Sequence, residues 1–225
     1  METTAKKFSV KTVALIGMFI ALSFVVTFLS KLIPINIAGF LTFDLKDVIV
    51  AICGFIMGPL PAVITAVISS LIEMLTISST GPIGFVMNIL STCAFVVPAA
   101  ILYHRKKKFT DALIGIIIGI ICMAAIMILW NWLITPLYMG VPRDVVVAML
   151  VPVFLPFNLI KGGINGALTL LLYKPVVTAL RKARLVAPSS GNGRKNTALT
   201  VGVTIASIVV VATLVLVVLV WTDII

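Results

Sequence analysis

The chain consists of long apolar segments separated by short polar connections. An α-helix needs about 20 apolar residues to cross a hydrocarbon core about 30 Å thick. Segments of period-two alternation, which membrane β-strands would show, are not visible. The pattern therefore predicts an all-α membrane protein with spans at 12–30, 45–58, 60–78, 84–103, 110–136, 150–173 and 198–221.

Composition supports a membrane protein rather than a soluble domain. Of the 225 residues, 61% are hydrophobic and 11% are charged, and the mean hydropathy is +1.27. The cysteines, Cys53, Cys93 and Cys122, all fall inside predicted spans without paired spacing. We interpret them as small apolar residues and expect neither a disulfide framework nor a metal site.

The basic residues indicate how the chain is oriented in the membrane. With a cytoplasmic N-terminus, the outer connections hold only Lys31, Lys46 and Arg143. The inner segments then hold Lys6, Lys7, Lys11, Arg105, Lys106, Lys107, Lys108, Lys174, Arg181, Lys182, Arg184, Arg194 and Lys195. This bias follows the positive-inside rule, so the net charge of +10 predicts membrane topology and not nucleic-acid binding.

Two connecting segments have unusual compositions. The outer loop 31–43, "KLIPINIAGFLTF", is too apolar for an exposed loop, so we expect it to fold back as a lid. Residues 187–196, "APSSGNGRKN", have the composition of a flexible cytoplasmic linker. This linker would separate a six-span domain, residues 1–186, from an additional C-terminal transmembrane helix within 197–225. Ala198, Gly202 and Ala206 give that helix a ridge of small residues, typical of a packing or anchoring helix.

Lys161 is the most conspicuous polar residue within a span. Asn158, Lys161 and Asn165 are spaced to share one helical face. Because a charge at the bilayer centre costs roughly 2.5–3.5 kcal/mol, such a residue usually faces a cavity or a partner. Pro152 and Pro156 predict an irregular segment before a helix that starts near 156. Lys161 either contacts a ligand or forms a structural pair with Glu73.

Glu73, Asn88 and Asn131 are the other polar residues of interest. Glu73 lies near the outer end of its span and would otherwise reach water, and each asparagine would otherwise form a helix–helix hydrogen bond. With the Lys161 face, all of these groups fall in the outer halves of four spans. We therefore expect one externally facing pocket for a small organic molecule. An ion pathway would need polar groups along the full depth of the membrane.

The remaining motifs concern partners and chemistry. Ala14, Gly17 and Ala21 form a small-residue pattern on the first span, suited to docking another helix or to internal packing. The sequence contains no GxxxxGK[ST] phosphate loop and no Ser–His–Asp or His–Glu metal spacing. We therefore predict neither ATP hydrolysis by this chain nor enzymatic activity.

Four segments and their order resemble a known family. "FLTFDLKD" (40–47), "GPIGFVMN" (81–88), "NWLITPLY" (131–138) and "LPFNLIK" (155–161) are similar to the riboflavin-binding type of S component in energy-coupling factor (ECF) vitamin transporters. "GMFIA" (17–21) resembles the small-residue motif in the first helix of that family. The resemblance covers about residues 8–185 and implies a six-helix S-component bundle. The seventh span departs from the family pattern.

The resemblance also implies a binding site and partners. Asn131, Asn158 and Lys161 would contact the isoalloxazine ring of riboflavin, which is a transported substrate and not a cofactor. Glu73, Asn88 and the segment Gly39, Phe40, Leu41 and Thr42 would contact the ribityl hydroxyls or form the lid. Ala14, Gly17 and Ala21 would face a transmembrane coupling protein, which acts with two ATPase subunits.

Other functions stay open from the residues alone. An S component for another vitamin would use the same kind of pocket. An intramembrane enzyme using Glu73 would need a second catalytic group, and none is evident. A structural membrane subunit would bind no small molecule.

Overall fold

The computed structural model describes residues 9–32, 36–37, 41–186 and 197–221, and the predicted linker 187–196 lies outside these ranges. The described chain is helical apart from a two-stranded antiparallel hairpin, which confirms the all-α prediction. Its elements are α1 (Val10–Lys31), β1 (Asn36–Ile37), β2 (Leu41–Thr42), α2 (Lys46–Met57), α3 (Pro59–Thr76), α4 (Gly81–Lys106), α5 (Phe109–Met139), α6 (Arg143–Met149), the π-helix η1 (Leu150–Phe154), α7 (Leu155–Lys182) and α8 (Thr197–Trp221).

Six helical segments in the described chain are long and apolar enough to cross a membrane: Val10–Lys31, Pro59–Thr76, Gly81–Arg105, Phe109–Met139, Arg143–Lys182 and Thr204–Trp221. The predicted second span is the exception, because α2 has only 12 residues. At about 1.5 Å per residue, this helix is roughly 18 Å long, which is shorter than the hydrocarbon core. With the non-helical residues before it, α2 still brings the chain from β2 to the His104 end of α4, where the Gly54 carbonyl oxygen lies 3.0 Å from His104 Nε2 and α3 begins its return.

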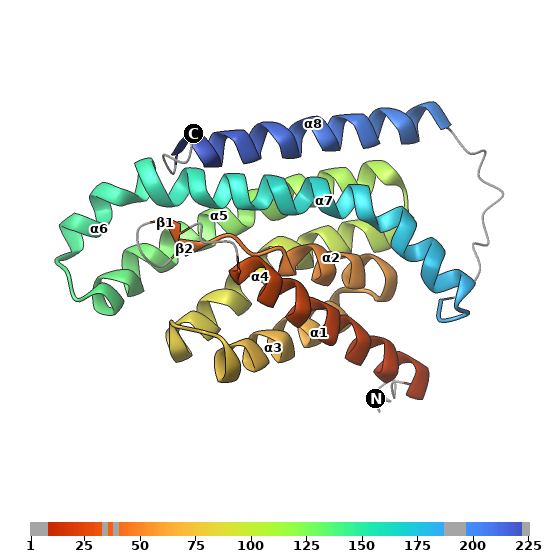
Figure 1. The fold of residues 1–225 in the computed structure, drawn as a ribbon, viewed down its shortest axis with the longest axis horizontal. Coiled ribbons are helices and arrows are strands. Elements are labelled where there is room, and N and C mark those ends of the chain that lie inside the picture. The colour runs from red at the N-terminus through yellow and green to blue at the C-terminus, as the bar shows by residue number, and fades with distance from the viewer. Residues whose placement is uncertain (1–8, 33–35, 38–40, 187–196, 222–225) are drawn as a thin grey trace, which may run out of the picture.

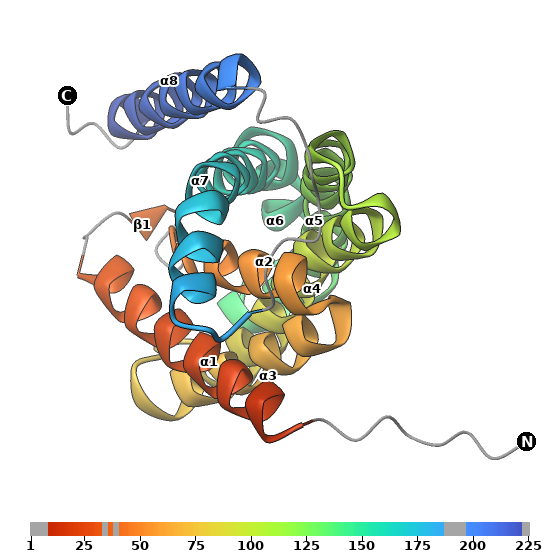
Figure 2. The same ribbon diagram turned by 90° about the vertical axis from the view of Figure 1, so that its right-hand side faces the viewer.

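The short helix α2 lies inside the bundle. It packs against α1, α3, α4 and α7, and Figure 2 shows it surrounded by these helices. Ala51, Ile52 and Cys53 are completely buried on it. Gly58, with φ +104°, ends α2, and Pro59 starts α3 immediately afterwards. The backbone conformation at Gly58 favours glycine, and the following proline suits the first turn of a helix.

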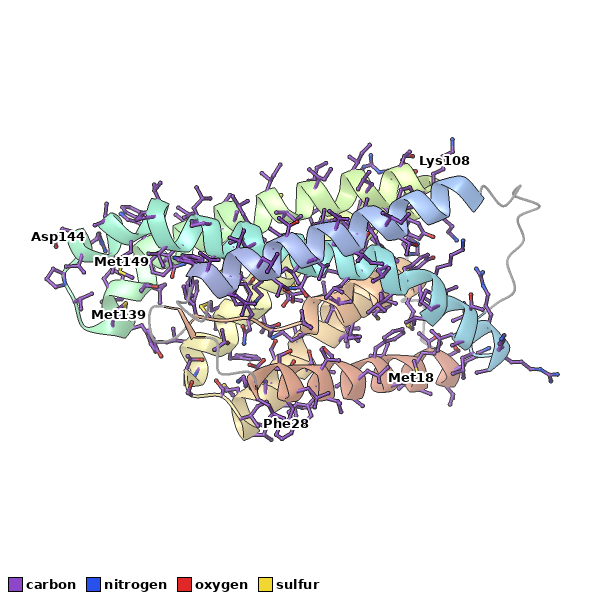
Figure 3. The ribbon with its side chains drawn as sticks, turned by 45° about the horizontal axis from the view of Figure 1, so that its top comes forward. Met18, Phe28, Lys108, Met139, Asp144 and Met149 are labelled. Carbon is purple, nitrogen blue, oxygen red and sulfur yellow. The ribbon has the colours of Figure 1, made fainter. Side chains whose placement is uncertain are left out.

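The two ends of the bundle are clearly separated. Figure 3 shows Lys108 at one end and Met139, Asp144 and Met149 at the other. Helices α4 and α5 meet at the Lys108 end, whereas α5, α6 and η1 meet at the opposite end. We call these the basic end and the hairpin end, because β1 and β2 lie toward the second one (Figure 1).

Helices α4 and α5 pack with their backbones in close contact. A Cβ atom added to Gly115 would lie 2.8 Å from the Cα of Ala99, and one added to Gly119 would overlap the carbonyl oxygen of Phe95. Neither neighbour can move without shifting the helix, since the nearest atoms belong to its backbone. Glycine at these positions thus sets the distance between the two helices.

We expect Gly119→Ala to destabilise the protein by about 1–3 kcal/mol, since overpacking forces the two helices apart. Thermal unfolding in detergent measures this change. Gly202→Ala on α8 is the matched control, because a Cβ there meets nothing within 4 Å. Alanine favours a helix over glycine, so the control should keep or slightly raise the midpoint. Equal midpoints for the two variants would contradict close packing at Gly119.

The sixth predicted span is longer than expected. It forms one continuous helical segment from Arg143 to Lys182, with η1 between α6 and α7. Pro152 lies within η1 and Pro156 in the first turn of α7. The predicted irregular segment before a helix near 156 is thus a π-helical turn, in which the chain continues without a break.

The additional helix is present as α8, and it packs along α7 (Figure 1). The predicted ridge of small residues does not make this contact, because Gly202 and Ala206 are exposed. Instead, Leu214, Val218 and Trp221 pack with residues of α7. The prediction from small-residue spacing was wrong here because large aliphatic side chains form the interface.

Candidate binding cavity

A cavity of about 300 Å³ opens between the helices at the hairpin end. Its walls come from the end of α1, β2, the segment before α2, α3, the α3–α4 connection, α4, α5 and α7. The lining residues are Lys31, Leu41, Thr42, Asp44, Glu73, Ile77, Ser79, Thr80, Met87, Asn88, Ser91, Met127, Phe157, Asn158 and Lys161. Both charged groups and apolar side chains therefore face one space.

Lys161 lies at the wall formed by α7, where its ammonium binds Asp44. The Lys161 Nζ and Asp44 Oδ2 atoms are 2.7 Å apart, and both residues are 7% exposed. Asn165, one turn further along α7, donates its side-chain amide to the main-chain oxygen of Asp44 at 3.1 Å. Asp44 is thus fixed to α7 through both its side chain and its backbone.

Glu73 accepts from three partners on the opposite side of the cavity. Lys31 Nζ lies 3.0 Å from Glu73 Oε1, and Lys46 Nζ lies 3.0 Å from Glu73 Oε2. Asn88 donates its amide to the same Oε2 atom at 3.2 Å. Only 5% of Glu73 is exposed, so this carboxylate is held by cations and an amide rather than by bulk water.

These contacts exclude the alternative that Lys161 forms its structural pair with Glu73. Lys161 pairs with Asp44, whereas Glu73 pairs with Lys31 and Lys46. Lys46 was assigned to an outer connection, but it lies in the first turn of α2 and is 1% exposed. The alternative that Glu73 reaches water is also wrong.

The charges around the cavity are balanced. Three lysines, Lys31, Lys46 and Lys161, face the carboxylates of Asp44 and Glu73, and Asp47 is buried nearby on α2. Asp47 accepts from Thr92 Oγ1 at 2.6 Å. Buried ions need such partners because an unpaired charge in a low-dielectric interior is costly. The result is a polar cavity with little net charge, held rigid by hydrogen bonds.

Six of the nine predicted substrate-binding residues line the cavity: Leu41, Thr42, Glu73, Asn88, Asn158 and Lys161. Gly39 and Phe40 lie outside the described residues. Asn131 is fully buried but is absent from the lining. Its amide donates to the Met127 carbonyl, and its oxygen accepts from Thr135, both at 2.7 Å. Met127, one turn away on the same face of α5, does line the cavity.

Asn158 and Lys161 keep hydrogen-bonding capacity beyond their protein contacts. Asn158 donates one amide hydrogen to the Phe154 carbonyl at 2.7 Å, and its second hydrogen and its oxygen are additional groups. An ammonium has three donors, and the Asp44 contact uses one of them. Phe157, from the same turn of α7, adds an aromatic ring to the lining. The α7 wall therefore offers hydrogen-bonding groups next to a flat apolar ring.

The small residues of α1 are separate from this cavity. Ala14, Gly17 and Ala21 are all exposed, and a Cβ added to Gly17 meets nothing within 4 Å. Internal packing, the alternative for these residues, therefore does not apply within the described chain. They form an open strip on the outside of the bundle.

Comparison with known proteins identifies the family. Residues 11–173 match the model for "ECF transporter, substrate-specific component". The chain belongs to this family of S components. It is 29% identical over 178 residues to the "Riboflavin transporter RibU" of Staphylococcus aureus (strain TCH60), covering 76% of this chain and 93% of the relative.

The fold of this S component agrees with a solved relative. A structure described as "Structure and mechanism of the S component of a bacterial ECF transporter" aligns with a TM-score of 0.65 and 28% identity. The alignment covers 76% of this chain and 98% of the relative. The family is a transporter component and not an enzyme, as the sequence predicted. The chain is a multi-pass membrane protein.

Proposed function

We propose that this S component binds riboflavin in the cavity at the hairpin end and takes part in its uptake. The observation that carries the proposal is the wall of α7, where Asn158, Lys161 and Phe157 face one space of about 300 Å³. Ligand pockets typically combine such apolar surfaces with a few placed polar groups. The similarity to a protein named as a riboflavin transporter supports the same substrate.

The chemistry of the flavin fits this wall. The pyrimidine edge of its ring alternates carbonyl acceptors with one N–H donor, and an asparagine amide offers both complementary groups. The ammonium of Lys161 suits the electron-rich N1/O2 side, and Phe157 suits the flat ring. On the opposite side, Glu73 and Asn88 offer partners for the ribityl hydroxyls. Asn131 stays a predicted ring contact, and Gly39–Thr42 a predicted lid.

The proposed orientation places the cavity on the extracellular side. The basic end, which contains Lys107 and Lys108, would lie in the cytoplasm with the N-terminus. Energy would come from separate subunits, because the sequence contains no phosphate loop. We propose a transmembrane coupling protein with two ATPases as those partners.

A riboflavin titration of the detergent-purified protein, followed by tryptophan fluorescence, tests the proposed substrate. We expect saturable quenching that Asn158→Ala weakens roughly tenfold or more, because the variant loses hydrogen bonds in a desolvated site. Leu137→Ala, an exposed change at the same end, should leave the affinity unchanged. Absence of quenching would reject riboflavin, and another vitamin would then be the substrate to test. Absence of any ligand would favour a structural subunit.

The open strip on α1 leads to a separate prediction. If Ala14, Gly17 and Ala21 contact the coupling protein, Gly17→Leu should abolish riboflavin uptake by cells and leave riboflavin binding intact. A large side chain would keep the two helices apart. Gly202→Leu on α8, which is equally open, is the control and should preserve uptake. Normal uptake with Gly17→Leu would place the coupling protein elsewhere.

A further inference from the structure

A second cavity lies at the basic end, opposite the proposed riboflavin site. Its volume is about 310 Å³, and it is formed by α2, α4, α5, α7 and α8. The lining residues are Phe55, Tyr103, Lys107, Phe109, Ala112, Leu170, Leu171, Tyr173, Lys174 and Thr204. None of these residues contributes to the proposed riboflavin site, so the cavity needs its own explanation.

The inner wall of this cavity is a cluster of three aromatic rings. Phe55 lies with its ring centroid 4.8 Å from that of Tyr103 and 5.7 Å from that of Tyr173. The hydroxyl oxygens of Tyr103 and Tyr173 are 2.6 Å apart. Since only one hydroxyl can donate to the other, the pair retains one O–H group for another acceptor.

Two lysines complete the lining beside apolar side chains. Lys107 and Lys174 are exposed, whereas Phe109, Leu170 and Leu171 are half-buried. Lys107 ends α4 in the left-handed conformation, with φ +53°, and this residue turns the chain toward α5. No carboxylate is among the described residues that line the cavity. The lining therefore combines two positive charges, a hydroxyl donor and an apolar surface.

We infer that this cavity binds an anionic phospholipid. Its phosphate contacts Lys107, Lys174 and the tyrosine hydroxyls, and an acyl chain lies along Leu170 and Leu171. Basic pockets between helices at the cytoplasmic side of membrane proteins suit acidic lipid head groups. An anionic phospholipid of the surrounding bilayer has both parts that this cavity would bind, a negatively charged head group and an apolar acyl chain. Thr204 belongs to α8, outside the matched residues 11–173, so the additional helix contributes one wall.

Native mass spectrometry of the purified full chain, titrated with phosphatidylglycerol or phosphatidylcholine of the same acyl chains, tests this inference. We expect preferential retention of phosphatidylglycerol. The double variant Lys107→Gln and Lys174→Gln should weaken it about tenfold or more. Lys108→Gln with Lys182→Gln is the control. It removes the same charge from exposed residues at the same end that do not line the cavity.

Several results distinguish specific binding of the lipid in this cavity from non-specific attraction of anionic lipids to the basic end. Equal weakening by the two double variants would overturn the inference, as would equal retention of the two lipids. Competition by millimolar glycerol phosphate would also overturn it, because the ligand would then be a soluble phosphate compound. A diazirine-labelled phosphatidylglycerol gives a second measurement, and crosslinks in residues 103–112 and 170–174 are expected. Crosslinks confined to other segments would reject the site. An unchanged midpoint of thermal unfolding in detergent shows that each variant is folded.

Discussion

Lys161→Met is expected to lower both the stability of the protein and its affinity for riboflavin. Asp44, which is 7% exposed, would lose the ammonium that lies 2.7 Å from its carboxylate. Removing one partner of a buried ion pair typically costs about 3–5 kcal/mol, because the remaining charge is uncompensated. The affinity should fall roughly 100-fold if a charge-assisted hydrogen bond to the ligand is lost as well. Thermal unfolding and fluorescence titration measure the two effects.

A double variant separates the two roles of Lys161. Asp44→Asn together with Lys161→Met removes both charges, so we expect it to recover much of the lost stability. Riboflavin affinity should remain low, because the ligand contact is still absent. Recovery of affinity in the double variant would show that Lys161 serves only to neutralise Asp44. Lys182→Met, at an exposed lysine of α7, should change neither quantity.

Glu73→Gln is expected to have the second-largest effect. The carboxylate holds Lys31, Lys46 and Asn88, and Lys46 is 1% exposed. A neutral amide leaves the buried ammonium of Lys46 without its full counter-charge, and the stability should fall by about 3 kcal/mol or more. The exposed change Asp144→Asn is the matched control and should be nearly neutral.

The effect of Glu73→Gln on binding tests where the ribityl chain lies. We expect a moderate loss of riboflavin affinity, and lumiflavin, which has no ribityl hydroxyls, should bind the variant and the original chain equally. Both affinities are measured at a temperature well below the unfolding midpoint of the variant, so that both proteins are folded. Equal loss for both flavins would instead place Glu73 near the ring or assign it a structural role alone.

The sequence predicted the number and type of most elements because apolar length is a strong signal. Each predicted span corresponds to a helix, and α3, α4, α5 and α7 all contribute residues to the cavity. The spacing of Asn158, Lys161 and Asn165 correctly predicted one buried face. The small residues of α8 failed as a packing signal because spacing alone does not show which face meets a neighbour.

The charged network could not be predicted with the same success. Asp44, Lys46 and Asp47 border an apolar segment, where charges normally reach water, and the pattern assigned Lys46 to an outer connection. They are buried because α2 lies inside the bundle, where α1, α3, α4 and α7 pack around it. The short apolar run between "DLKD" and the break at Gly58–Pro59 is the sequence signal that would have revealed this.

Because the π-helical turn η1 comes directly before α7, the number of residues in this turn helps to determine the proposed substrate preference. A π-turn holds one residue more than an α-turn, and each added residue rotates the following side chains by about 100°. A deletion within 150–154 would therefore turn Asn158, Lys161 and Asn165 together away from Asp44 and the cavity. Among relatives, a one-residue gap at this point would change the recognition surface more than many individual substitutions.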